Sequence, residues 1–303
     1  MPAPLAGLPR LQRTRAEAMT DAQGFLDELA RKPPKLPFDP GLLREVLKLT
    51  SDDSRAPANR LAEVVGRDQA LSTRLLRMAN SAYYGLQSEV PSVQRAVAVL
   101  GMAEVRALIL AVAASGIAGR RNLPATFDLS GYWRHQLCVA ACCRMLARRV
   151  SPGEADVLYT AGLLHDIGKL LMAGLCPDAW QAVQALMAEE HLETAEAEER
   201  HWGLDHGVIG ARLLSYWDLP PALTEPVNWH HAPQYAGAYE RNARLLNLAD
   251  RLLLMYERGD GVMPVTLADD LATFGLDAHV MAADLSVLLE GERIGQLVAH
   301  LAA

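Results

Sequence analysis

The sequence contains no cysteine pair that would suit a structural zinc site. Its four cysteines are Cys138, Cys142, Cys143 and Cys176, and no two of them form a CxxC motif. Cys138 and Cys142 share a helical face, as is typical of small buried apolar residues. Unpaired thiols of this kind are typical of a reducing compartment, and we therefore expect a cytoplasmic protein.

The chain also lacks a long apolar run and an excess of positive charge. Its most apolar stretch, residues 107–119, is shorter than the about 20 apolar residues that a membrane-spanning helix needs. Residues 1–10 contain no apolar signal-peptide core. The net charge is −7, and acidic and basic residues are interspersed. We therefore expect no general nucleic-acid binding and no membrane partner.

No stretch shows the sustained alternation of apolar and polar residues that predicts a β-strand. From Pro40 onward the apolar residues instead follow the helical period, as Leu42, Leu43, Val46 and Leu47 do. The predicted class is all-α, with many helices packed as a bundle. In the second half we predict helices over residues 132–149, 154–173, 177–190, 205–217, 220–230, 239–257, 267–274 (capped by Thr266) and 277–301.

Breaks in this pattern predict three regions. Residues 1–36 form a leader that ends at Pro33 and Pro34 and either docks as a helix or stays a mobile arm. Residues 37–258 form the main domain, which a polar break near 119–131 divides into an N-terminal helical subdomain (37–120) and a second subdomain (121–258). Residues 259–303 form a helical extension, which we expect to pack on the bundle, with a partner surface as the alternative.

Residues 161–169 (AGLLHDIGK) place His165 and Asp166 side by side in an apolar segment, with Lys169 one helical turn beyond His165. Burying ionisable groups among leucines is unfavourable unless another group pairs with them. A metal ion or a network of ion pairs would meet that demand.

The second half contains further candidate ligands on four other segments. They are His135, His206, His230, His231 and Asp250. Histidine and aspartate suit borderline or hard divalent ions such as Fe, Mn, Ni or Zn, and an aspartate has two oxygens with which to bridge two ions. We interpret the remaining histidines, His191, His201, His279 and His300, as ordinary core or surface residues.

Taken together, these motifs resemble the HD superfamily of metal-dependent phosphohydrolases and, within it, the HDOD group of HD-related output domains from bacterial signalling proteins. The resemblance spans roughly residues 37–255. The matching segments are 163–169 (LLHDIGK), 67–71 (RDQAL), 75–82 (LLRMANSA), 96–101, 133–135 (WRH), Glu199 with Gly203 and His206, 210–220, and 230–233 (HHAP).

The resemblance implies a helical N-terminal subdomain packed on an HD-like core with one or two divalent ions. One ion would be held by His135, His165, Asp166 and Asp250. A second would take Asp166, His206 and either His230 or His231, and Lys169 would face a substrate phosphate.

Two hypotheses follow from the resemblance. The preferred one is a signalling module that acts through protein partners and whose metal is structural or sensory. The alternative is a phosphohydrolase related to the HD-GYP cyclic-di-GMP phosphodiesterases, acting on a nucleotide or cyclic dinucleotide, with Asp166 and Lys169 as catalytic residues. The sequence departs from HD-GYP in having Ala232 where Glu is expected, no Gly-Tyr-Pro segment, and Gly131 where a third ion would need a carboxylate.

Overall fold

The computed structural model describes residues 22–32, 34, 36–51, 54–117, 123–258, 263–289 and 293–302. Within these ranges all regular structure is helical and no strand occurs, which confirms the all-α prediction. Most of the predicted leader (1–21) and the predicted break at 259–261 lie outside the described residues. In the part described, no single helix is both long and apolar enough to cross a membrane. Two pairs of consecutive described helices are long and apolar enough when taken together, but each pair is bent at its junction. The bend is 118° between Val93–Leu100 and Met102–Ser115, and 98° between Val265–Thr273 and Ala278–Leu289.

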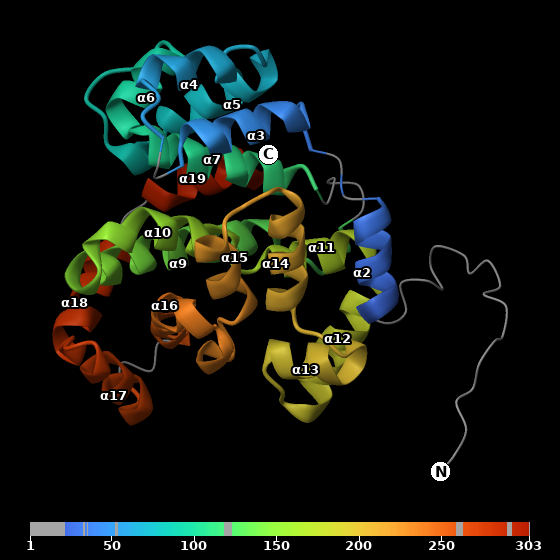
Figure 1. Cartoon of the computed structure of the whole chain (residues 1–303). Helices are drawn as coiled ribbons and strands as arrows, with labels where there is room; N and C mark the ends of the chain where they lie inside the picture. Colours follow the sequence, from blue (N-terminus) through green and yellow to red (C-terminus); the bar gives the residue numbers. More distant parts are fainter. Residues whose placement is uncertain are drawn as a thin grey trace, which may run out of the picture.

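The first helices form an N-terminal lobe, seen at the top of Figure 1. Its elements are α3 (Pro40–Leu49), α4 (Ala58–Val65), α5 (Gln69–Ala79), the short η1 (Ala82–Tyr84), α6 (Val93–Leu100) and α7 (Met102–Ser115). Side-chain caps fix several helix starts, because Asp39, Asp68 and Ser92 each accept a hydrogen bond from a first-turn backbone N–H. Helix α7 is buried on nearly all sides and links the lobe to the rest of the fold.

The leader contributes one docked helix, α2 (Ala22–Arg31). Its Phe25 is 1% exposed, and the Phe25 and Trp202 ring centroids lie 4.8 Å apart. The described part of the leader therefore packs against the core, where its contacts are with residues that are distant in the sequence.

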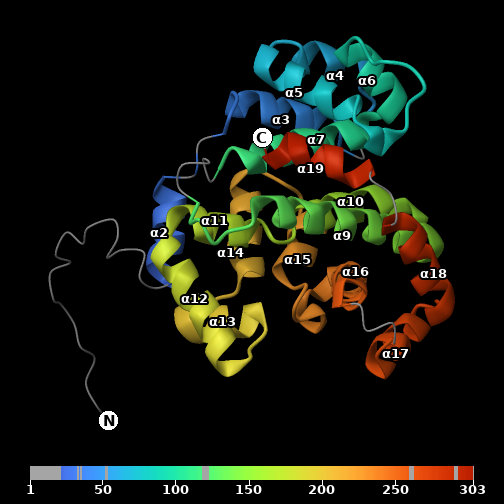
Figure 2. The ribbon, with the colours of Figure 1, turned by 180° about the vertical axis from the view of Figure 1, so that it is seen from behind.

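The long helix α9 (Leu129–Val150) and the shorter α10 (Ala155–Leu164) lie side by side across the middle of the molecule (Figures 1 and 2). Their close approach depends on Gly162, since a Cβ there would lie 2.8 Å from the Cα of Ala140. Around this pair pack α11 (Ile167–Leu175), α12 (Pro177–Glu190), α13 (Thr194–Trp202), α14 (His206–Tyr216), α15 (Pro221–Asn228) and α16 (Glu240–Arg258). Helix α13 was not predicted from the sequence.

The prediction of a single helix over residues 154–173 is wrong, because a turn at His165 and Asp166 interrupts it and separates α10 from α11. Consecutive residues on one helix point about 100° apart, so an unbroken helix would aim these two side chains in different directions. After the break, α11 packs against α14 so closely that a Cβ on Gly168 would lie 2.0 Å from the carbonyl oxygen of His206. The turn thus brings both motif side chains to one centre.

The C-terminal helix predicted over 277–301 is also wrong, because it is two helices, α18 (Ala278–Leu289) and α19 (Arg293–Ala302). The preceding α17 (Val265–Thr273) begins one residue before Thr266, so Thr266 is not its cap. Helix α19 lies between the N-terminal lobe and α9, with Leu297 fully buried and Gln296 Oε1 accepting from the backbone N–H of Ala82 at 2.8 Å. The end of the extension is therefore an internal part of the fold.

Candidate metal centre

All seven predicted ligand residues converge on one centre in the second half of the chain. They come from α9 (His135), the turn after α10 (His165, Asp166), the start of α14 (His206), the segment after α15 (His230, His231) and α16 (Asp250). Three sets place ligand atoms within 4.8 Å of one another: His135 with His165 and Asp250, His165 with Asp166 and His230, and His206 with His230 and His231. The sets overlap, so they form one continuous cluster.

The buried rings of His165 and His230 are held in the orientation that a metal ligand requires. His165 Nδ1 lies 2.8 Å from the carbonyl oxygen of Gly162, and His230 Nδ1 lies 2.7 Å from that of Val227. Because a carbonyl only accepts, each Nδ1 carries the proton and each Nε2 has a free lone pair. Both Nε2 atoms are buried and have no hydrogen-bond partner. An ion is the partner that such atoms fit.

Electrostatics keep the carboxylate of Asp166 ionised. Its Oδ2 accepts from Lys169 Nζ at 2.8 Å, and its Oδ1 lies 2.8 Å from His206 Nε2. Burial alone would raise the pKa of Asp166, but the nearby ring of His165 and the charges of Lys169 and His206 hold it well below its usual range. Burial also lowers the pKa of His165 to about 3, so that ring stays neutral. Asp166 and His165 are therefore in the forms that bind metal, whereas His206 would release a proton on binding an ion.

On the other side of the cluster, His135 Nε2 lies 3.1 Å from Asp250 Oδ1 and 3.6 Å from Asp166 Oδ2. Burial opposes ionisation of Asp250, but the ring of His135 beside it lowers the pKa of the carboxyl to about 2. The two aspartates therefore place two negative charges around His135 and His165, and this charge suits a divalent cation.

The buried Glu198 holds His206, and the sequence analysis did not identify it. Its Oε2 lies 2.6 Å from His206 Nδ1, and although burial favours the neutral ring, this carboxylate raises the pKa of His206 to about 9. The resemblance had pointed to Glu199, whose side chain is exposed. The sequence does contain one indication of this role. Glu198 lies four residues before the apolar Trp202, and residues with that spacing lie on the same face of a helix, here the buried face.

Gln136 and Asn247 are two further supporting residues that the prediction did not include. Gln136 Nε2 donates to Asp166 Oδ2 at 3.3 Å, and Asn247 Nδ2 donates to the backbone oxygen of His230 at 2.8 Å. Both contacts fix the position of a ligand candidate rather than adding a ligand.

A cavity of about 740 Å³ opens beside the cluster. His135, Asp166, His231 and Asp250 form part of its wall. Lys169, Arg251 and Arg258 also line it, together with the acids Asp128 and Glu193. The side chain of Lys169 is 21% exposed and reaches the centre itself. The cluster is therefore accessible from outside, unlike a closed structural site.

The all-helical bundle and its His/Asp cluster are typical of proteins with an HD-like helical fold. A family model, the HDOD domain, matches residues 36–233. The chain belongs to the HDOD domain family.

Solved structures share the fold over nearly the whole chain. A protein named "Putative phosphohydrolase" from Shewanella amazonensis SB2B is 27% identical, with a TM-score of 0.72 over 94% of this chain and 100% of that chain. An HDOD domain protein with unknown function from Geobacter sulfurreducens is 22% identical, with a TM-score of 0.73 over 91% and 95% of the two chains.

A curated relative is also similar in sequence. It is an uncharacterized protein from Treponema pallidum, 23% identical over 219 residues. The match covers 71% of this chain and 41% of the relative, so this chain matches well under half of that protein's length.

Proposed function

We propose that this chain is a signal-transduction module of the HDOD type whose HD-like core binds one or two divalent transition-metal ions, Fe, Mn, Ni or Zn. The observation that carries the proposal is the pair of buried Nε2 atoms of His165 and His230, which have no hydrogen-bond partner. Leaving such atoms unpaired in a dry interior is unfavourable, and an ion removes the penalty. Output would pass through protein partners that bind the helical surface.

The test is metal content measured by plasma mass spectrometry on protein purified without chelators. We expect roughly one to two equivalents in the wild type and a loss of most of it in Asp166→Asn, because Asp166 is central to the cluster. Asp269→Asn is the matched control, since Asp269 is exposed on α17. Less than about a tenth of an equivalent in folded wild-type protein would contradict the proposal.

A second candidate function, phosphoester hydrolysis, is favoured by the position of Lys169 between the cluster and the open cavity. Bound ions would supply an activated water and neutralise phosphoryl charge. Lys169 would bind the phosphoryl oxygens, while Glu198 would keep His206 in place. The name of the Shewanella protein agrees with this chemistry.

Hydrolysis is tested with cyclic-di-GMP and with bis(p-nitrophenyl) phosphate in the presence of Mn²⁺. We expect Asp166→Asn to abolish turnover and Lys169→Met to reduce it about 100-fold, because removal of one electrostatic stabiliser has that effect. Lys48→Met, an exposed lysine on α3, is the control. No turnover by fully metal-loaded protein on either substrate would exclude this candidate and leave the signalling proposal.

A further inference from the structure

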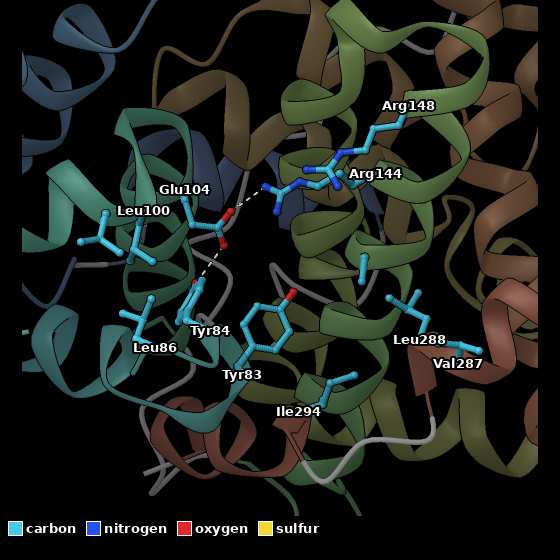
Figure 3. A pocket seen from close by; sticks show the side chains of 12 residues that line it. Tyr83, Tyr84, Leu86, Leu100, Glu104, Arg144, Arg148, Val287, Leu288 and Ile294 are labelled. Atoms are coloured by element: carbon cyan, nitrogen blue, oxygen red, sulfur yellow. Dashed lines mark hydrogen bonds and ion pairs between the residues drawn. The ribbon is translucent and has the colours of Figure 1, made fainter. Parts of the chain in front are cut away.

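A second cavity, of about 910 Å³, lies away from the metal cluster (Figure 3). Three distant parts of the chain form its wall: the N-terminal lobe, α9, and the C-terminal helices α18 and α19. The lobe contributes Tyr83, Tyr84 and Leu100, and the C-terminal helices contribute Leu288 and Ile294. None of the candidate metal ligands lines it.

The acid in this cavity is already neutralised. Glu104, which is 6% exposed, accepts from Arg144 Nη2 through Oε2 at 2.6 Å and from the Tyr84 hydroxyl through Oε1 at 2.8 Å. The Arg144 guanidinium also stacks 3.5 Å from the ring centroid of Tyr159. These contacts, two of them drawn in Figure 3, fix a polar wall that carries no net charge.

The surplus charge of the cavity is positive and comes from Arg148. This arginine lies one turn beyond Arg144 on α9 and is exposed, and no described residue forms a hydrogen bond or ion pair with it. Among the described lining residues, the charged groups are Glu104, Arg144 and Arg148, so the local charge is +1. Arg148 is therefore the charged side chain of the described wall that is available to pair with an anion, in a chain whose net charge is −7.

The rest of the lining is apolar. Leu86, Leu100, Leu288 and Ile294 surround the tyrosine rings, which meet edge to face at 4.9 Å between centroids. A concave, mostly apolar site with a few fixed polar groups and one free cation is the form that small-molecule sites take in proteins.

We infer that this cavity is a second binding site, for a small organic anion with an apolar body, whose acidic group pairs with Arg148 and whose body packs on Tyr83, Leu100 and Leu288. Such a ligand would bridge all three segments of the wall. Helix α9 carries both Arg148 and, 13 residues earlier, His135 of the metal cluster, roughly 20 Å along the axis. The inference does not depend on the metal proposal, because no residue is shared.

The probe is 8-anilinonaphthalene-1-sulfonate, an apolar body with one anionic group, compared with its uncharged analogue N-phenyl-1-naphthylamine. Both are titrated by fluorescence into the folded full-length protein. We expect saturable binding of the sulfonate and about fivefold weaker binding in Arg148→Gln, with the affinity of the neutral probe unchanged. Arg212→Gln, which removes an exposed arginine of α14 outside the cavity, should change neither affinity.

A second variant tests the apolar part of the site. Ala141 lies on α9 in the wall of the cavity, and Ala141→Leu should weaken both probes because it fills space. Far-UV circular dichroism and the urea unfolding midpoint serve as the check that the fold is intact. Equal sulfonate affinities in Arg148→Gln and Arg212→Gln, or sulfonate binding without saturation, would overturn the inference.

Discussion

A single carboxylate oxygen of Glu198 holds both the ring and the backbone of His206. Its Oε2 lies 2.6 Å from Nδ1 of His206 and accepts from the backbone N–H of the same residue at 2.7 Å. The ring of His206 is thereby fixed with Nε2 aimed at Asp166 Oδ1, 2.8 Å away. The placement of His206 thus depends on a residue that would not itself touch a metal ion.

Replacing Glu198 should therefore weaken metal binding without removing a ligand. We expect Glu198→Gln to lower the affinity about 10- to 100-fold, because the ring loses its charged anchor. Competition against a chromophoric chelator measures the affinity. The neighbouring Glu199→Gln is a matched control, since Glu199 is exposed. The same affinity in both variants would show that Glu198 has no part in the site.

The contact between α11 and α14 should not tolerate a methyl group at Gly168. A Cβ there would lie 2.0 Å from the backbone oxygen of His206, so we expect Gly168→Ala to lower the free energy of unfolding by roughly 1–3 kcal/mol and to displace His206. Urea unfolding followed by circular dichroism measures the change. Gly295→Ala is the control, because this helical glycine of α19 has nothing within 4 Å of its added Cβ. It should be neutral or stabilise by about 0.5–1 kcal/mol.

The ion pair between Glu104 and Arg144 joins α7 of the N-terminal lobe to α9 of the core. The Glu104 and Arg144 side chains are 7% and 19% exposed, and without the Glu104 charge Arg144 keeps only a longer contact, 3.6 Å, with the exposed Asp156. We expect Glu104→Gln to lower the free energy of unfolding by about 3 kcal/mol. Glu63→Gln breaks an exposed pair with Arg60 and should change it by less than about 1 kcal/mol. Similar decreases in the free energy of unfolding in the two variants would mean that the buried pair does not hold the N-terminal lobe to the core.

The cysteines should be unreactive in the folded protein. All four are buried, and burial raises the pKa of Cys138 to about 11 and the pKa values of Cys142 and Cys143 well above the usual range. The thiolate is the reactive form, so raising the pH from 7 to 9 should leave native labelling slow. In denaturant, where the thiol pKa returns to about 8.5, the same change should accelerate labelling strongly. Labelling with Ellman's reagent measures both rates, and fast native labelling at pH 8 would contradict the burial.

Part of the candidate centre could be predicted because its residues have a chemical signature. His165 and Asp166 stand out as an ionisable pair among leucines. His135, His206, His230, His231 and Asp250 are residue types that bind metal, and the resemblance implied how they would be divided between two ions. Supporting residues such as Glu198 and Gln136 have no such signature. Their roles depend on distances between helices that are separate in sequence.

The sequence by itself determined the all-helical class, the apolar faces of most helices and the set of candidate ligands, because helical periodicity and side-chain chemistry are local properties. Only the tertiary structure decided that a turn at His165 and Asp166 interrupts the helix. It also decided that α19 packs between the N-terminal lobe and α9, and that Glu198 rather than Glu199 contacts His206. Each of these outcomes depends on which surfaces meet when distant helices pack, and the local chain does not encode that alone.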